Sequence, residues 1–568
     1  MYPVQERRSI PFGLVVHGMI AGCCLVLSGC GGGSGGGGGS GGGGGTGTAT
    51  VQVSGLARFE RVPITASGLD YAAVSMAPIR MARVQIRNAA GTSILAEGAT
   101  GEDGAWSLTA PASTAVQVVV VAALVRDGAE VVTVVDGLAG DARHAIALPM
   151  SLSGADRSGV DLVATAGWSE DAGAYDPDRR QSGPFAILDT VLEAQDLILS
   201  ADPDVALPAL TINWGPDNTA TTVGTSFYDP ETGELTILGG ADEDTDEFDP
   251  HVVAHEWGHW FEFTFSRSDS LGGSHGIGDV LDETVAFGEG WGNAFSGMVN
   301  DEPIYRDSNG VAQAQIGVDM DLDGDAVGDG DTHSPSGLLL DGGWSEASIQ
   351  EILWDLYDGG GGDDDAVSLG FAPLYEVFVG PQKTTPAFTS IYSFLHELKN
   401  DLPAQSATIA ARAAEENVRA HDLYEQTETG RRRYTVIPAD GSAVTTDIDG
   451  DALTTYDTFG GIDEANNKLF NRLLFRISGA AGATVTVTVT PLDPDHDVAI
   501  ATPEGSVDDV VGGAESAEGI LEADGSAVFS VRSFPTDANP SGVTPFEIQI
   551  DTVPSSAVGL LGIPVGDG

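Results

Sequence analysis

The sequence of 568 residues predicts a multidomain protein in which an α+β domain lies between two β-sandwiches. Runs rich in β-branched residues dominate the parts before residue 154 and after residue 431, whereas helix-forming stretches fill the middle. The length suits three or four domains. We therefore expect β-sandwiches at 48–154 and 431–568 and an α+β domain at 155–430.

The amino-acid composition excludes some classes of partner and of metal site. The chain has 84 Asp and Glu residues against 25 Lys and Arg residues, for a net charge of −59. Such a surface repels phosphate backbones, so we expect no nucleic-acid partner. All three cysteines lie within the first 30 residues, so the folded body is expected to contain no disulfide framework and no thiolate metal site.

The N-terminus has the features of a targeting segment. Arg7 and Arg8 precede the apolar run 10–27, which is followed by Ser, Gly and Cys30. This ending resembles the lipobox of bacterial lipoproteins. The resemblance implies a signal peptide at 1–29, lipidation of Cys30 and a location in the bacterial cell envelope, anchored to a membrane by lipid. An ordinary cleaved signal or a short anchor helix is the alternative.

Residues 30–47 are rich in Gly and Ser, which predicts a flexible tether. Beyond it, the segment 84–108 resembles the carboxypeptidase-regulatory-like β-sandwich, and we expect it to act as a spacer. The strands expected at 471–489 and 497–500 resemble the bacterial pre-peptidase C-terminal β-sandwich, a module that accompanies secreted peptidases.

The middle domain holds seven of the ten histidines, so we look there for chemistry. Its predicted helices cover 185–199, 249–263, 280–299, 345–357, 388–398 and 407–418, and a short strand is expected at 235–238.

The second of these helices carries a candidate metal site. His255 and His259 are four residues apart, so one helix face presents both imidazoles to one Zn²⁺ ion. Glu256 follows the first histidine, where it can act as a general base. His251 lies one turn earlier, too far along the axis to share the ion, and is expected to be structural. The helix is predicted to start with Asp249 as its N-cap.

The third ligand must come from elsewhere, and Glu289 on the following helix is the best candidate. Glu283 and His275 are its rivals. Asn293, four residues after Glu289, is placed to hydrogen-bond a ligating histidine. A third histidine six residues after His259, as in metzincins, is absent from the sequence.

These motifs resemble the gluzincins, the thermolysin-like zinc peptidases, although that family often carries Asp where this chain has Asn293. The resemblance implies a zincin-like catalytic domain in which His255, His259 and Glu289 hold Zn²⁺ and Glu256 is the catalytic base. It also implies that the expected hairpin at 227–238 supplies an edge strand for the substrate; an ordinary sheet edge is the alternative.

Downstream, His333 begins a His-Ser-Pro-Ser-Gly segment that is similar to the His-x-Asn-Ser-Gly segment of thermolysin-like enzymes. This likeness implies that His333 stabilises the oxyanion. A solvated loop histidine is the other interpretation, with Tyr305, Tyr357 or Tyr392 as substitutes in the catalytic role.

Two acidic runs complete the inventory. Asp319, Asp321 and Asp323, followed by a glycine, resemble the start of a calcium loop, although the twelfth position lacks Glu. Both a Ca²⁺-ordered loop and a solvated acidic turn stay open there. The run 242–247 lacks the glycine, and we expect it to be solvated.

The sequence thus predicts a membrane-anchored zinc peptidase, with endopeptidase activity favoured, that acts on extracytoplasmic proteins or peptides. A surface-binding or adhesion lipoprotein with a vestigial zinc site is the alternative, and a purely structural lipoprotein is a third possibility.

Overall fold

The computed structural model describes residues 49–553 except 170, 312–314, 324–340, 360–366, 420–421, 428–432, 450–466, 470, 494, 504, 508–509, 511 and 535–542. The predicted signal peptide, Cys30 and His333 lie outside these residues. Among the helices of the described residues, none is both long and apolar enough to cross a membrane.

The N-terminal part consists of strands. They are β1 (Thr50–Arg61), β2 (Ile64–Thr65), β3 (Gly68–Leu69), β4 (Ser75–Pro78), β5 (Ala82–Asn88), β6 (Ile94–Ala99), β7 (Ala105–Pro111), β8 (Ala115–Arg126), β9 (Ala129–Asp136), β10 (Ala142–Arg143), β11 (Ala145–Ser151) and β12 (Leu162–Ala164). In β8 an almost unbroken apolar run is buried on both faces, as expected for a strand covered from two sides.

The middle part alternates short strands and helices. Its strands are β13 (Trp168–Ser169), β14 (Ala174–Tyr175), β15 (Leu210–Trp214), β16 (Phe227–Asp229), β17 (Glu234–Ile237), β18 (Ile304–Asn309) and β19 (Gln315–Asp321). Its helices are α1 (Gly183–Ala201), α2 (Pro250–Phe265), α3 (Glu283–Asn300), α4 (Glu346–Tyr357), α5 (Phe371–Val379), α6 (Ile391–Asp401) and α7 (Ser406–Glu415).

One sheet joins these two parts of the chain. Its nine strands follow the order β16-β17-β15-β9-β8-β5-β6, with β10 beside β9 and β11 beside β8. Strands β9 and β15 pair in parallel, from Leu210 opposite Val132 to Asn213 opposite Val135. The sheet therefore runs across residue 154, and a single apolar core includes side chains from both sides of that position.

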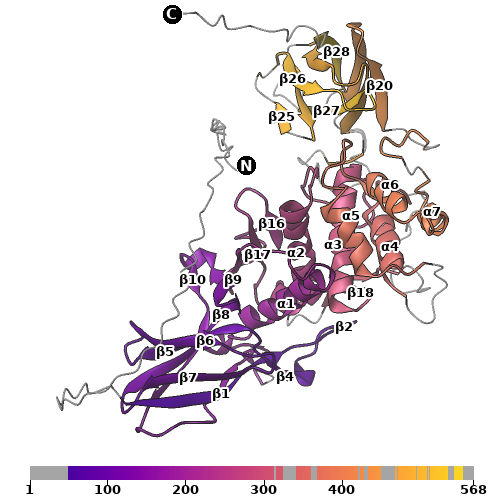
Figure 1. Cartoon of the computed structure of the whole chain (residues 1–568). Helices are drawn as coiled ribbons and strands as arrows, with labels where there is room; N and C mark the ends of the chain where they lie inside the picture. The colour runs from indigo at the N-terminus through magenta and orange to yellow at the C-terminus, as the bar shows by residue number, and fades with distance from the viewer. Residues whose placement is uncertain are drawn as a thin grey trace, which may run out of the picture. The chain divides into compact units, whose positions relative to one another are not determined.

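The helices that carry the candidate site pack closely. Helix α3 contacts α2 on one side and α4 on another, and the three lie side by side in Figure 1. Glycine allows this approach: a Cβ atom on Gly290 would lie 2.6 Å from Cβ of Ile349 in α4. No larger residue fits there without moving a helix.

The C-terminal part is a pair of sheets. Its strands are β20 (Tyr434–Pro438), β21 (Val444–Asp449), β22 (Arg472–Ser478), β23 (Thr484–Pro491), β24 (Asp497–Thr502), β25 (Gly505–Val507), β26 (Glu515–Ile520), β27 (Ser526–Phe534) and β28 (Val543–Val553). One sheet has the order β20-β22-β27-β24-β25 and the other β21-β28-β23-β26. In β23, Thr and Val alternate between partly exposed and buried positions, as in a strand that covers a core on one face.

The molecule is thus a mixed α and β protein with several sheets, consistent with β-sandwich modules. Two local expectations change. Asp249 does occupy the N-cap position of α2, but its carboxylate makes no capping bond and instead accepts hydrogen bonds from Ser308. Helix α5 was not among the predicted helices.

Candidate functional site

The candidate site begins on α2. Pro250 opens the helix, a position where its missing N–H costs no hydrogen bond. One turn separates His255 from His259, and their Nε2 atoms lie 2.9 Å apart. Both side chains are largely buried.

Helix α3 brings the third candidate ligand to the same point. Oε2 of Glu289 lies 3.3 Å from Nε2 of His255 and 3.3 Å from Nε2 of His259. Ligand atoms at 2.0–2.1 Å from a tetrahedral zinc ion are about 3.3–3.4 Å apart. The three atoms therefore fit one zinc ion, and they form one of the clusters of potential metal ligands among the described residues.

Asn293 fixes the orientation of the first imidazole. Nδ1 of His255 donates to Oδ1 of Asn293 over 2.8 Å, and Nδ2 of Asn293 donates to Oε1 of Gln350 over 2.9 Å. With the proton on Nδ1, the lone pair of Nε2 points to the cluster, as a metal ligand requires.

Glu256 and Tyr305 lie next to these ligands. Burial lowers the pKa of His259, but the carboxylates of Glu289 and Glu256 outweigh burial and raise it to about 9. The ring of Tyr305, on β18, lies 6.1 Å from that of His255, centroid to centroid. Burial, together with Asp307 and Glu256, raises the pKa of Tyr305 well above its usual value.

His275 contacts the cluster from the loop between α2 and α3. Its Nε2 atom lies 3.2 Å from Oε2 of Glu289 and 3.5 Å from Oε2 of Glu346. This rival for the third ligand lies beside Glu289, and His275, Glu289 and Glu346 form a second group of potential metal ligands among the described residues. Sequence reasoning missed Glu346 altogether, because a carboxylate in the first turn of a helix is ordinary.

The other rival for the third ligand, Glu283, is paired outside the cluster. Glu283 lies 3.6 Å from Arg433 and is not in the cluster. Tyr357 ends α4, and Tyr392 lies in α6 beside Gly343. His251 is buried against Ser296, and burial lowers its pKa to about 3, in keeping with a structural role.

The expected calcium-loop residues do not converge in the described part of the chain. Asp319 faces Arg306 at 3.3 Å, and Oδ1 of Asp321 accepts a hydrogen bond from the backbone N–H of Asp323. The next residues of that loop, 324–340, lie outside the described residues.

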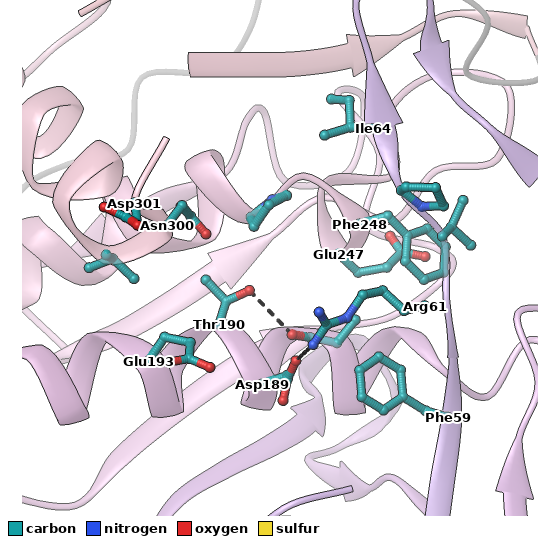
Figure 2. Close-up of a pocket in the computed structure, with 15 residues that line it drawn as sticks. Phe59, Arg61, Ile64, Asp189, Thr190, Glu193, Glu247, Phe248, Asn300 and Asp301 are labelled. Carbon is teal, nitrogen blue, oxygen red and sulfur yellow. Dashed lines mark hydrogen bonds and ion pairs between the residues drawn. The ribbon is translucent and has the colours of Figure 1, made fainter. Parts of the chain in front are cut away.

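A separate cavity of about 380 Å³ lies near the N-terminal end of α2, away from the histidines. Figure 2 shows Arg61 reaching the carboxylate of Asp189 across it, with Glu193 nearby. Arg80 also pairs with Asp189, at 2.7 Å, so the charge of this carboxylate is balanced within the protein.

Comparison with known proteins relates the middle of the chain to peptidases. Residues 200–414 match the family model described as the Mycolysin C-terminal domain, a domain found in zinc peptidases. The match includes α2 and α3 and thus all three residues of the histidine–glutamate cluster. It covers less than half of the chain. No curated protein matches.

Among solved structures, the pre-peptidase C-terminal domain of a collagenase from Bacillus anthracis shares 9% identity over 21% of this chain and 94% of its own, with a TM-score of 0.14. PliG, a periplasmic inhibitor of g-type lysozyme from Aeromonas hydrophila, shares 13% over 21% of this chain and 98% of its own, with a TM-score of 0.13. A 9R-lipoxygenase from Cyanothece PCC8801 shares 10% over 28% of this chain and 25% of its own, with a TM-score of 0.13. TM-scores this low do not define a common fold.

Proposed function

We propose that this peptidase-related chain is a zinc-dependent peptidase that cleaves peptide bonds in extracytoplasmic proteins or peptides. The observation that carries the proposal is the triangle of His255 Nε2, His259 Nε2 and Glu289 Oε2, with sides of 2.9, 3.3 and 3.3 Å. Glu256, next in sequence to His255, supplies a carboxylate beside this triangle. The family match over residues 200–414 supports the same class.

When bound, zinc supplies Lewis acidity, which lowers the pKa of water and polarises a carbonyl group. Glu256 accepts a proton from the water that attacks the peptide carbonyl carbon. It then gives that proton to the amide nitrogen as the C–N bond breaks. Asn293 keeps His255 in the tautomer that ligation needs. We retain His333 as the proposed donor to the oxyanion, with Tyr305 as its substitute.

The sheet edge supports a peptide substrate. Strand β16 is outermost in the nine-stranded sheet, and its Tyr228 packs on Phe263 of α2 with ring centroids 5.9 Å apart. An extended peptide that pairs with β16 would run beside the helix that carries His255 and His259. The lipobox-like sequence at Cys30 supports attachment of this activity to a membrane of the cell envelope.

The test is Glu256→Gln in the full-length chain, measured by metal analysis and casein hydrolysis. We expect about one zinc per chain, as in the wild type, and a loss of hydrolysis of at least about 100-fold, because general-base catalysis contributes about 10²–10⁴. The matched control is Glu262→Gln on the same helix. Glu262 is outside the histidine–glutamate cluster, and Gln keeps the size of its side chain, so zinc content and hydrolysis should change little.

Three outcomes would contradict the proposal. Hydrolysis that survives in Glu256→Gln would remove the assigned base. Stoichiometric zinc with no wild-type hydrolysis would favour the alternative, a binding or adhesion lipoprotein. A chain without zinc would refute the metal site itself.

A further inference from the structure

The described residues contain three groups of potential metal ligands, and the histidine–glutamate cluster is one of them. Another is made of aspartates and includes Asp246, which is only 3% exposed, so the run 242–247 is not the solvated turn that the sequence suggested. The third consists of His275, Glu289 and Glu346. It shares Glu289 with the histidine–glutamate cluster and adds two residues that the proposed mechanism does not use.

This third group has the separations expected of ligands around one tetrahedral ion. Nε2 of His275 lies 3.2 Å from Oε2 of Glu289 and 3.5 Å from Oε2 of Glu346. Ligand atoms at 2.0–2.1 Å from a tetrahedral zinc ion are about 3.3–3.4 Å apart, and both measured separations lie close to that value. The two carboxylates are buried, whereas the imidazole is 26% exposed, so an ion can reach the group from solvent.

The other ring nitrogen of His275 determines how this imidazole can act. Its Nδ1 atom lies 3.2 Å from the backbone oxygen of Gly273, and because a carbonyl oxygen only accepts, Nδ1 carries the proton. In the neutral ring, the lone pair of Nε2 therefore faces two carboxylate oxygens. His255 has the same arrangement, with Nδ1 bonded to Asn293 and Nε2 facing Glu289. Metal-ligating histidines commonly donate their second N–H to a carbonyl or carboxylate group in this way.

Glu346 also lacks enough partners for a buried carboxylate. It is the first residue of α4, and its side chain is 6% exposed. Within the described part of the chain, the one ion pair of its carboxylate is that with His275, and no hydrogen bond is added to it. Because burial of a charge is costly without such bonds, a cation at this point would stabilise the carboxylate.

The backbone on either side of His275 is fixed by the C-terminal segment. Nδ2 of the buried Asn467 donates to the backbone oxygens of Gly272 and Ser274, each over 3.0 Å. The loop between α2 and α3 is thus fastened directly beside His275. Its imidazole is presented to α3 and α4 by a held backbone, as a ligand position requires.

We infer that His275, Glu289 and Glu346 form a second site for a transition-metal ion of the zinc class, with Glu289 as a ligand to both ions. The imidazole nitrogen suits Zn²⁺ and disfavours Ca²⁺ and Mg²⁺, which take oxygen ligands. In two-metal hydrolase sites the ions are about 3.5–4 Å apart, so one carboxylate can bind both. The inference rests on the metal site of the proposed function through Glu289, but it does not depend on hydrolysis.

The experiment is a calorimetric titration of the full-length chain with Zn²⁺. The chain is stripped of metal with EDTA, dialysed free of chelator and first loaded with one Zn²⁺ per chain. The wild type should then bind one more Zn²⁺, more weakly than the first, and lose it again on dialysis. Glu346→Gln and His275→Ala should bind this second ion at least about tenfold more weakly, since even the loss of a partner of a ligand costs about 10–100-fold. Both should keep the first Zn²⁺ through dialysis, which a misfolded variant would not.

Glu397→Gln is the matched control. Glu397 is a half-buried residue of α6 outside the three groups, so this variant should bind the second Zn²⁺ as the wild type does. The inference is overturned if the wild type binds only one Zn²⁺, since a proton on Nε2 of His275 would then be the partner of the two carboxylates. It is also overturned if Glu346→Gln and Glu397→Gln bind the second ion equally well.

Casein hydrolysis is recorded separately, so that the two proposals can fail independently. A chain that hydrolyses casein and binds a single Zn²⁺ would support the proposed function and overturn the second site. An inactive chain that binds two Zn²⁺ ions, the second of them lost in Glu346→Gln, would contradict the peptidase function and support the second site.

Discussion

Asn293 shows how one side chain controls another at the candidate site. Its Oδ1 atom accepts a hydrogen bond from the Nδ1–H of His255, and its Nδ2 atom donates one to Oε1 of Gln350. Replacement of such a partner of a metal-ligating histidine typically weakens metal binding by about 10–100-fold. We therefore expect Asn293→Ala to lower zinc affinity within that range, measured by competition with a zinc chelator.

Asn293→Asp is the informative comparison. The carboxylate keeps an acceptor for His255 and loses only the donor to Gln350. It should retain most of the zinc affinity that Asn293→Ala loses. Equal losses in the two variants would show that the bond to His255 does not matter.

For individual residues, the sequence was informative where the spacing within one helix determines which side chains lie close together. His255 with His259, and Glu289 with Asn293, are both four residues apart, and the structure brings these four side chains together. It was uninformative where contacts join distant segments. Neither the approach of His275 to Glu346 nor that of Asp307 to Asp246 follows from a local pattern, because each joins segments more than sixty residues apart in the sequence.

At the scale of the element, the glycines of α3 set the distance between helices. A Cβ atom on Gly292 would lie 2.9 Å from Cε1 and Nδ1 of His255, closer than such atoms approach. Gly292→Ala should therefore displace the imidazole, and we expect zinc content to fall well below one per chain.

Gly288→Ala is the control on the same helix. The nearest atom to its added Cβ would be Oε2 of Glu262 at 3.4 Å, an ordinary contact. Alanine also favours a helix by up to about 1 kcal/mol over glycine. This variant should keep its zinc and unfold at the same or a higher temperature; zinc loss in both variants would point to the helix as a whole rather than to His255.

Each helix expected from the sequence has a counterpart among the described residues, whereas the shortest α-helix, α5, was not expected. Helices α1 to α4 lie within a few residues of their expected ranges. Helix α5 is only nine residues long, mostly apolar, and contains a proline near its start, so its sequence does not distinguish a helix from a buried strand.

For the molecule as a whole, a buried ion-pair network joins the C-terminal segment to α3. The carboxylate of Asp282, at the N-cap of α3, lies 2.6 Å from Arg472 and 2.9 Å from Arg433. Loss of one partner from a buried pair typically costs about 3–5 kcal/mol. We expect Arg472→Met to lower the free energy of unfolding by that amount in urea titrations.

Arg58→Met serves as the control, since Arg58 and Asp161 form a partly exposed pair at 3.6 Å that is worth at most about 1 kcal/mol.

Acid gives a second test of the ion-pair network around Asp282. Burial alone would raise the pKa of Asp282, but Arg472 and Arg433 outweigh burial and hold it well below its ordinary value. The stabilisation that these two ion pairs give the folded protein is complete above the pKa of an Asp side chain in the unfolded chain, about 3.9, and is lost as pH falls further. Arg472→Met should lose less stability over that range; an equal acid response in both proteins would contradict the assignment.

The sequence indicated two parts rich in strands around one rich in helices, and the described residues follow that order. It could not indicate that β9 and β15 are neighbours, because parallel pairing across more than seventy residues leaves no local trace. It could not indicate the network around Asp282 for the same reason.

The parallel pair β9 and β15 also bears on how this protein can be divided or recombined. A gene fragment that starts at residue 155 would encode β15 with its β9-facing edge open and α1 without the strands beneath it. Open strand edges promote association between chains. A fragment that contains the histidine helix and keeps this edge of β15 paired must therefore extend back at least to β9, which begins at Ala129.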